Sequence, residues 1–513
     1  MKFRRSVLLL AVALLLTGVQ QRAYADPPKL AAILLGDVDT YTPISTVTEG
    51  PFTLRVPASY RNRFESVNRF PMDRYGTRIE QNFEWLPEVR VGAQLESSFE
   101  KFPVHLFAEY EQDLTTGTAV GAPNQAGYHL PNGIELDAQL RKGYLRADLG
   151  KYFVMAGGYM MSHWGMGLLA NDGAHGWLPG SARFSDPRYG DRVLRGYVGT
   201  QPLTDYGLVL RVAYDDVVDD DVLLEHDTAT QWIFSARAGS EQKTAAGIYV
   251  VYRQQDSSVR RGFDVWAIDF TASHVLSVSD IGILTLATEN VIVTGDTRLA
   301  PTPDLPRKDI LQFAHTLDLR LDCGGYGGVL SFLYASGDQN FEDKDQNAFK
   351  ADPNFEFGLL LFRQVLAAQS GRAPIIGGDP GLTGRPVPDL DRIATSGSPT
   401  NTIAFFPRGW IRTQDGLEAY GGPLIALSEV NEADPFNTRL AGGAPRNFLG
   451  GNPSNFYGVE LDAGVRYRTM LFGTELTTGI EGGVLFPGNA FLQLDGTRMG
   501  EVLGVRAMVD YRL

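Results

Sequence analysis

The sequence of 513 residues predicts an all-β protein, a transmembrane up-and-down antiparallel β-barrel of about 16 strands, with 18 strands as the alternative. Three observations predict this fold. The C-terminal segment alternates between apolar and polar residues, the N-terminus has the pattern of a secretory signal, and short and long connections alternate between the predicted strands.

The last fifteen residues, Met499 to Leu513, form the clearest predicted strand. Every second residue from Met499 to Leu513 lies on one face, and all of these are apolar except Glu501. The other face carries Arg506 and Asp510. A bilayer-crossing strand needs roughly nine to eleven residues with one apolar side, which this segment provides. The segment resembles the C-terminal signal that the barrel-assembly machinery recognises in Gram-negative outer-membrane barrels, with Leu513 in place of the more usual Phe.

The first 25 residues predict a secretory signal peptide. Three basic residues precede an unbroken apolar stretch from Val7 to Leu16, and Ala23-Tyr24-Ala25 has the small-x-small pattern of a cleavage site. The apolar stretch is too short for a spanning helix, which needs roughly twenty residues. We therefore expect residues 26–51 to form a periplasmic N-terminal segment and residues 52–513 to form the barrel.

Composition is compatible with a barrel and excludes other classes. No stretch after the signal has eighteen consecutive apolar residues, so a helical membrane protein is excluded. Cys323 is the only cysteine, which excludes an internal disulfide and a cysteine-based zinc site. The formal net charge is −14, and the predicted signal removes only cations, so a nucleic-acid partner is not expected.

The predicted strands and their connections give the topology. The strands are 52–66, 77–98, 103–114, 134–147, 151–161, 190–200, 206–215, 231–239, 245–253, 263–273, 281–294, 310–322, 326–337, 457–468, 472–486 and 499–513. Connections between them alternate between short and long, as periplasmic turns and extracellular loops require. Leu86-Pro87 is a candidate break in 77–98, and a further strand pair within 352–456 gives the alternative of eighteen.

The longest connection, 338–456, is rich in Gly and Pro and contains one helix-like stretch, Phe357 to Gln369. Loops of this length are uncommon and tend to be functional. A barrel of sixteen to eighteen strands encloses an aqueous channel unless something fills it. We interpret the insertion as partly outer surface and partly a loop that narrows the lumen. A disordered external loop is the alternative.

Two segments, 134–170 and 326–350, contain motifs with a family resemblance. The motifs are Leu140 to Arg146, the loop residues Trp164, Gly165 and Gly167, and the run Ala335 to Asp338. They are similar to motifs in the alginate-export type of outer-membrane porins. The resemblance implies a porin-like barrel, and in that family a basic pore lining conducts an anionic polysaccharide. Here Tyr159-Met160 stands where the family has Arg-Gln, and the predicted lining is mixed in sign.

Charged residues on the inner faces of the most regular strands are the candidate pore-lining residues. They are Asp318, Arg320, Glu460, Asp462, Arg466, Glu475, Glu481, Arg506 and Asp510. Opposed walls of charge orient polar solutes and tune selectivity. The alternative is that these residues pair across strands as salt bridges that rigidify the wall.

An acidic run in a predicted external loop is a candidate weak Ca²⁺ site. Its members are Asp215, Asp216, Asp219, Asp220 and Asp221. Ca²⁺ prefers several carboxylate oxygens, but a solvated acidic loop is the alternative. The sequence has neither a metalloprotease HEXXH motif nor a Gly-x-Ser-x-Gly nucleophile elbow, so we expect no catalytic residues, no enzyme activity and no cofactor.

The sequence therefore predicts a protein of the cell outer membrane that contacts lipid and lipopolysaccharide. The first interpretation is a monomeric or homotrimeric channel for passive or substrate-selective passage of small polar solutes. The first alternative is an export channel for a secreted polysaccharide. The second is a structural or adhesive surface barrel with a plugged lumen.

Overall fold

A computed structural model provides the structure of the protein. It describes residues 46–79, 83–98, 104–117, 135–150, 152–173, 184, 190–220, 222–223, 227–239, 243–257, 262–278, 281–298, 306–338, 343–378, 395–471 and 474–512. The predicted signal peptide and most of the predicted periplasmic segment lie outside these residues. No helix among the described residues is long and apolar enough to cross a membrane.

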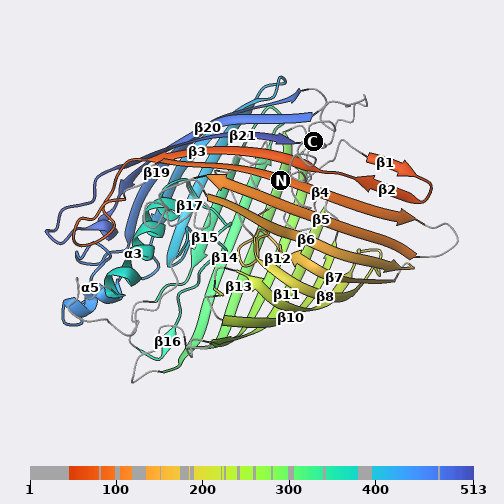
Figure 1. The fold of residues 1–513 in the computed structure, drawn as a ribbon. Coiled ribbons are helices and arrows are strands. Elements are labelled where there is room, and N and C mark those ends of the chain that lie inside the picture. Colours follow the sequence, from red (N-terminus) through yellow and green to blue (C-terminus); the bar gives the residue numbers. More distant parts are fainter. Residues whose placement is uncertain are drawn as a thin grey trace, which may run out of the picture.

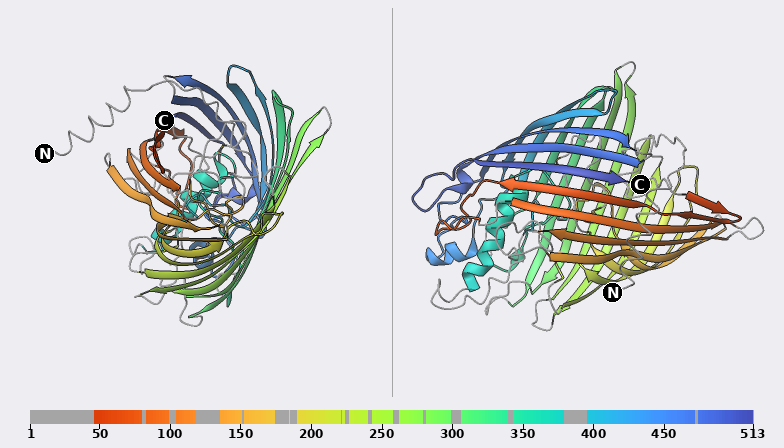
Figure 2. Two further views of the ribbon diagram at one scale, coloured as in Figure 1. Left: turned by 90° about the vertical axis from the view of Figure 1, so that its right-hand side faces the viewer. Right: turned by 45° about the horizontal axis from the view of Figure 1, so that its top comes forward.

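Eighteen antiparallel strands of the described chain form one closed wall (Figures 1 and 2). They are β3 (Ala58–Val67), β4 (Phe83–Ser98), β5 (Val104–Gly117), β6 (Glu135–Leu149), β7 (Phe153–Met161), β8 (Arg192–Thr200), β9 (Val209–Asp219), β10 (Asp227–Gly239), β11 (Thr244–Ser257), β12 (Phe263–Val278), β13 (Gly282–Thr297), β14 (Lys308–Asp322), β15 (Tyr326–Ala335), β17 (Thr402–Arg412), β18 (Leu417–Leu427), β19 (Phe456–Leu471), β20 (Thr474–Pro487) and β21 (Val502–Arg512). Each strand pairs with the next one along the wall, and β21 pairs with β3 to close the cylinder.

The remaining elements lie at the ends of the wall or inside it. They are β1 (Thr46–Glu49), β2 (Phe52–Arg55), β16 (Asp345–Gln346), the π-type helix η2 (Leu361–Leu366), the α-helices α3 (Ala367–Gly378) and α5 (Pro435–Leu440), and the 3₁₀ turn η3 (Asn489–Phe491). The β1–β2 hairpin pairs with β4, and β16 pairs with β14. Helix α3 continues directly from η2, and the two together overlap the predicted helix-like stretch, Phe357 to Gln369.

The predicted count of sixteen strands is wrong, and the alternative of eighteen is confirmed. The two missing strands, β17 and β18, lie within the predicted insertion 338–456 and divide it into two loops, 336–401 and 428–455. Proline and glycine interrupt the alternation of both strands, with Pro407 in β17 and Pro423 in β18. These residues weaken the period-two pattern from which a strand is predicted.

The predicted break at Leu86-Pro87 is also wrong, because β4 runs without interruption from Phe83 to Ser98. The chain is interrupted instead in the preceding segment, between β2 and β3. There the carbonyl of Pro57 accepts a hydrogen bond from the N–H of Gly92 at 2.8 Å, so β2 and β3 pair with successive parts of β4.

The wall is apolar outside and polar inside. In β21, Leu503, Val505 and Val509 are exposed, whereas Arg506 and Asp510 are buried. This confirms the predicted direction of the two faces of the C-terminal strand. The strand begins at Val502, however, so the preceding residues 499–501 belong to the loop. A surface of this kind matches the lipid-facing band of a membrane barrel.

Exposed aromatic side chains stand at both ends of the wall. Phe153, Tyr206 and Tyr326 lie at the end with the short turns, and Phe83, Phe456 and Phe486 lie at the end with the long loops. Membrane barrels carry such aromatic girdles at the two lipid interfaces. The apolar band between the girdles therefore marks where the wall would meet lipid.

Candidate functional site: two loops across the barrel lumen

Two loops leave the wall and enter the lumen. The first inward loop comprises residues 162–173, between β7 and β8. The second inward loop comprises residues 347–372, between β15 and β17, and includes η2 and the first part of α3. Viewed down the barrel, the helix of the second inward loop, drawn in teal, lies inside the ring of strands (Figure 2, left).

The first inward loop is a tight turn built on two glycines. Gly165 and Gly167 have φ angles of 57° and 81°, and the N–H of Gly167 donates to the carbonyl of Trp164 at 2.9 Å. These left-handed conformations favour glycine. The ring of Trp164 stacks on Tyr249 of β11, with 5.2 Å between the ring centroids. The three residues of the predicted loop motif thus position this turn against the inner wall.

Glu289, from β13, anchors the first inward loop. Its carboxylate is buried and accepts hydrogen bonds from the backbone N–H groups of Met166, Leu168 and Leu169, the last two at 3.1 and 3.4 Å. A buried backbone N–H group without a partner costs free energy, so these bonds fix the position of the loop. Strand β13 lies six strands along the wall from β7, so the carboxylate holds the loop across part of the lumen.

Glu460, from β19, anchors the second inward loop in the same way. Its carboxylate accepts hydrogen bonds from the N–H groups of Leu359, Leu360 and Leu361 at 2.6, 2.8 and 2.7 Å. The first N–H groups of a helix have no partner within the helix, so an acceptor from the wall satisfies them. Asp462 adds a further bond to Leu359 at 3.3 Å. Two predicted pore-lining residues therefore cap η2.

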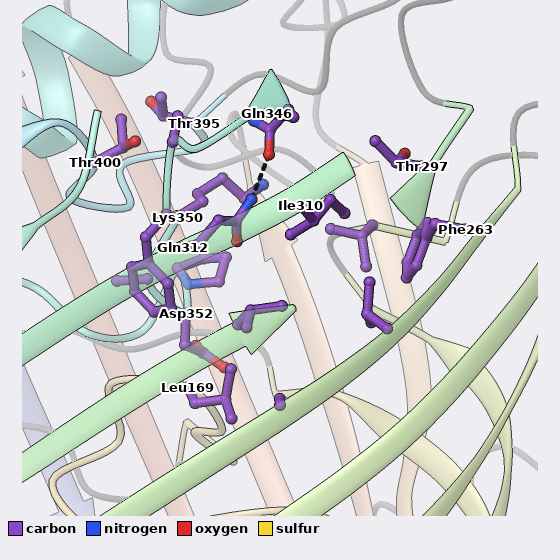
Figure 3. Close-up of a pocket in the computed structure, with 18 of the residues that line it drawn as sticks. Leu169, Phe263, Thr297, Ile310, Gln312, Gln346, Lys350, Asp352, Thr395 and Thr400 are labelled. Atoms are coloured by element: carbon purple, nitrogen blue, oxygen red, sulfur yellow. Dashed lines mark hydrogen bonds between the residues drawn. The ribbon is translucent and has the colours of Figure 1, made fainter. Parts of the chain in front are cut away.

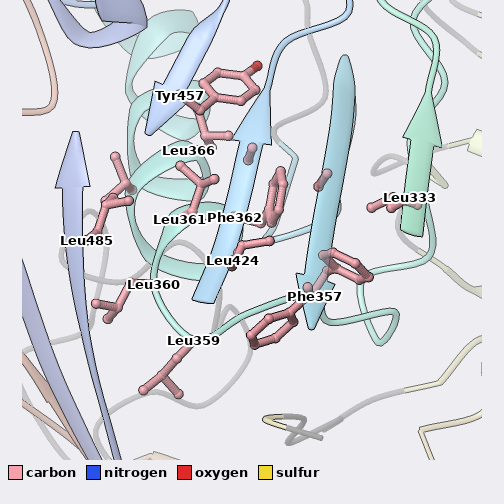
Figure 4. Packing of buried hydrophobic residues seen from close by; sticks show 14 of the residues in the cluster. Leu333, Phe357, Leu359, Leu360, Leu361, Phe362, Leu366, Leu424, Tyr457 and Leu485 are labelled. Atoms are coloured by element: carbon pink, nitrogen blue, oxygen red, sulfur yellow. The ribbon is translucent and has the colours of Figure 1, made fainter. Parts of the chain in front are cut away.

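Apolar packing also holds the second inward loop (Figure 4). Its buried apolar side chains include Phe357, Leu359, Leu360, Leu361, Phe362 and Leu366. They belong to the same buried cluster as Leu424, Tyr457 and Leu485 on the wall. Full burial of such a side chain contributes about 1.5–3 kcal/mol. One side of the lumen therefore contains a packed core.

Ion pairs tie the second inward loop to β3 and the loop that follows it. Glu65 of β3 accepts hydrogen bonds from Arg363 at 3.3 Å and from Gln364 at 2.8 Å. Arg372 donates to Asp73 at 2.9 Å. The loop is thus attached on two sides, at β19 and at β3.

The two inward loops bond to each other at Asp352. Its carboxylate accepts a hydrogen bond from the N–H of Asn171, and its own N–H donates to the carbonyl of Leu168, both at 2.9 Å. The side chain of Asn354 donates to the carbonyl of Asn171 at 3.5 Å. The two loops therefore form one connected structure across the lumen, which we call the septum.

A cavity of about 440 Å³ lies next to the septum (Figure 3). Strands β11 to β14 form one side, and the second inward loop forms another through residues such as Lys350 and Asp352. Leu169 and Ala170 of the first inward loop also line it. Phe263, Thr297 and Lys308, at the strand ends near the long loops, place the cavity toward that end of the barrel.

The other predicted pore-lining residues lie on the inner face of the wall and contact partners there. Glu481 binds Arg506 at 2.6 Å and Arg466 at 3.8 Å, and it accepts a hydrogen bond from Tyr420. Arg506 also donates to the carbonyl of Phe184 at 2.9 Å. This cluster joins β18, β19, β20 and β21.

The remaining members of the predicted set are spread around the wall. Asp510 pairs with Arg512 at 2.6 Å and with Arg61 at 3.5 Å. On β14, Arg320 lies over the ring of Trp410 at 4.4 Å, and Asp318 accepts a hydrogen bond from Ser331. Glu475 pairs with Arg468 at the short-turn end. The structure therefore does not bring the whole set to one place. Their role in permeation stays a prediction.

The acidic run does not converge in the described structure. It lies largely in β9 rather than in the predicted loop, so alternation sends Asp215 inward and Asp216 outward. Asp215 pairs with Arg195 at 2.6 Å, Asp219 with Arg192 at 2.8 Å, and Asp220 with Arg253. Asp221 lies outside the described residues. No group of three or more His, Cys, Asp or Glu among the described residues could hold a metal ion.

The sequence reasoning missed three residues that build the site, Glu289, Glu65 and Asp352. Glu289 is an acidic residue in the middle of a mostly apolar and threonine-rich strand, Leu284 to Thr294. That isolated charge on an inner position is the signal that could have identified it.

Solved structures of outer-membrane porins share this fold. OccAB1 of Acinetobacter baumannii aligns with a TM-score of 0.52 at 10% identity over 90% of this chain and 96% of that one. OprD of Pseudomonas aeruginosa aligns with a TM-score of 0.51 at 11% identity over 90% and 93%. OccK8 (OprE) of the same organism also gives 0.51 at 11% identity, over 90% and 98%.

The sequence itself matches no protein-family model and no curated protein. At these identities the structural likeness shows the fold alone. That fold is the closed 18-stranded antiparallel barrel of outer-membrane porins. The resemblance to the alginate-export type is not shown by these comparisons.

Proposed function

We propose that the protein is an outer-membrane channel for the substrate-selective passage of small polar solutes. The septum is the observation that carries this proposal. A wall of eighteen strands encloses enough space for an aqueous channel, and the septum narrows that space. The apolar outer band and its aromatic girdles support a position in the membrane, with lipid around the wall and lipopolysaccharide near the long loops.

The anchoring of the septum supports selective passage rather than general diffusion. Buried carboxylates from β13 and β19 fix the backbone of both inward loops, so the constriction has a defined shape. A solute that passes a fixed narrow opening exchanges water contacts for contacts with the pore lining. Selectivity then depends on the match between the solute and that lining.

The packed core beside η2 favours a second candidate, a surface barrel whose lumen is plugged. Apolar side chains from the second inward loop and from β15, β17, β18, β19 and β20 form this core, which fills space that an open pore would leave to water. Export of a polysaccharide is the alternative that the motif resemblance predicts. It requires a path past the septum that is wide enough for a polymer chain.

Recordings from planar lipid bilayers test the proposal. We expect purified, folded protein to produce discrete single-channel current steps in KCl. Replacing residues 349–372 with a short Gly-Ser linker should raise the conductance, because it removes most of the second inward loop. Asp205→Asn, which removes an exposed charge from the short turn between β8 and β9 and is not a candidate pore-lining residue, is the control and should leave the conductance unchanged. Correctly inserted protein without current steps would overturn the channel and favour the plugged barrel.

The assembly partners remain predictions. We infer that β21, with its apolar outer face, is the strand that the barrel-assembly machinery recognises. A homotrimer is one arrangement of such barrels, and cross-linking in native membranes would distinguish it from a monomer.

A further inference from the structure

The cavity beside the septum has an apolar wall, which is unusual for the inside of a membrane barrel. Interior positions of such barrels are mostly polar. Here Val251 of β11, Phe263 and Val265 of β12, Val293 of β13 and Ile310 of β14 line the same cavity. Phe263, Val265 and Ile310 form one buried cluster with Val293 packed against it. We call this surface the apolar strip.

A glycine lies in the middle of the apolar strip. Gly295 of β13 pairs with Val265 on one side and with Ile310 on the other. Its φ angle is 153°, and a Cβ there would lie 2.1 Å from the carbonyl oxygen of Asp264, so no side chain fits. Val265 and Ile310 therefore have no side chain between them on the wall.

The side of the cavity formed by the second inward loop and the residues before β17 carries several polar groups. Lys350, Asp352, Thr400 and Asn401 contribute polar groups there, beside apolar residues of the same loop such as Ala351 and Pro353. Gln312 donates a hydrogen bond to Gln346 at the edge of the cavity (Figure 3). Ligand sites commonly have roughly 300–1,000 Å³ and combine an apolar surface with a few polar groups. The cavity has both the size, about 440 Å³, and this combination of groups.

We propose that this cavity binds solutes with an apolar body, branched aliphatic or aromatic, and a polar or charged end, before they reach the septum. The inference rests on the proposed channel function and names the class of solute. The apolar strip takes the body of the solute, and the second inward loop faces the polar end. Small ions and sugars without an apolar part gain nothing from the strip, because they have little apolar surface to remove from water.

The test compares pairs of probes that share a charged group and differ in the apolar body. Benzyltrimethylammonium is compared with tetramethylammonium, and hexanoate with acetate. All are added on the long-loop side while single-channel K⁺ current is recorded. We expect the apolar member of each pair to block the current at about tenfold lower concentration, because it buries more apolar area.

Variants locate the effect. Val265→Thr combined with Ile310→Thr keeps both side chains branched but adds a hydroxyl group to each. In this double variant, the two probes of each pair should block the current at similar concentrations. Ile268→Thr is the matched control, because it makes a similar change on the exposed outer face of the same strand. The control should keep the tenfold difference.

The outcomes separate the two proposals. Equal block by both members of each pair in an open channel would overturn the binding inference and leave the channel function standing. Unaltered discrimination in the double variant would also overturn it. If no current is seen, the channel proposal fails, and calorimetric titration of the folded barrel in detergent with the same probes decides on the cavity. The apolar probes should then bind to wild type and Ile268→Thr, and about tenfold more weakly to the double variant.

Discussion

The two inward loops are attached to the wall by the same chemistry but supported in different ways. In each loop, one buried glutamate accepts hydrogen bonds from three backbone N–H groups. The first inward loop is a glycine turn with a stacked Trp164 that adds only Met166 and Leu168 to the large apolar core, whereas the second is the start of a helix that contributes most of its apolar side chains to that core. The comparison suggests that a wall carboxylate sets where each loop lies, and that packing sets how firmly it stays there.

Replacing the two anchoring glutamates one at a time should have the largest effect on the loops. Glu289→Leu leaves three N–H groups without their acceptor, and each unsatisfied buried group costs about 1–3 kcal/mol of folding free energy. Because the first inward loop has less apolar packing, we expect it to leave its position and the single-channel conductance to rise. Glu460→Leu should change the conductance less, because Glu65 and the apolar core still hold the second loop.

Conductance and the unfolding midpoint in denaturant are measured for both variants. A larger rise in conductance with Glu460→Leu than with Glu289→Leu would contradict the inference that packing and Glu65 hold the second inward loop in place. Asp205→Asn, in the short turn between β8 and β9, serves as the control for both.

Substitution of one glycine in each loop should also affect the two loops differently. Gly165 and Gly358 both have positive φ, which costs other residues about 1–2 kcal/mol. A Cβ on Gly165 would lie 2.6 Å from a carboxylate oxygen of Glu289. A Cβ on Gly358 would lie 2.5 Å from the flexible end of Leu424 and farther, 3.1 Å, from a carboxylate oxygen of Glu460. We expect Gly165→Ala to lower the free energy of unfolding more than Gly358→Ala. Equal losses in denaturant titrations would show that the anchor oxygen has room to move.

The joint between the loops should have a smaller effect. Asp352→Ala removes the carboxylate that accepts from Asn171, a bond to a charged group worth about 1.5–3 kcal/mol. We expect noisier open-channel current with little change in its mean, because each loop keeps its own anchor. Asp352→Asn, which retains an acceptor oxygen, is the matched control and should stay closer to wild type. A loss of all current in Asp352→Ala would contradict a role limited to joining the loops.

The smallest effect is expected for an ion pair far from the loops. Arg55 and Glu96 pair at 3.6 Å near the short-turn end, and both side chains are 43% exposed. Exposed pairs contribute about 0–1 kcal/mol. Glu96→Gln should therefore leave both the unfolding midpoint and the conductance near their wild-type values. A clear change in conductance would show that this end of the barrel also controls passage.

Much of the wall could be predicted from the sequence, because alternation is a local property. Each of the sixteen predicted strands coincides with a strand of the wall, with shifted ends. The pair β17 and β18 could be placed only as an alternative, since Pro407, Gly409, Gly421, Gly422 and Pro423 interrupt the pattern. The same alternation correctly predicted that the charged residues of β19 and β21 lie on the inner face.

The candidate site could be predicted only in part, because its contacts are not local. Trp164, Gly165 and Gly167 stood out as a motif, but their anchor Glu289 lies more than a hundred residues further along the chain. Glu460 and Asp462 stood out as inner charges, although alternation gave no sign that they cap a helix. Which inner charge meets which loop depends on strand register around the whole cylinder, and that register cannot be read from one strand.

The seam between β21 and β3 has a consequence for how the molecule is made. The side chain of Asn68 bonds to the carbonyl of Glu501, and these residues are 433 positions apart in the chain. Contacts of such separation form slowly, because a very long stretch of chain must first be brought together. A growing polypeptide therefore keeps β3 as an open edge until its final strand arrives. During that interval it depends on shielding by other molecules to avoid pairing with the wrong partner.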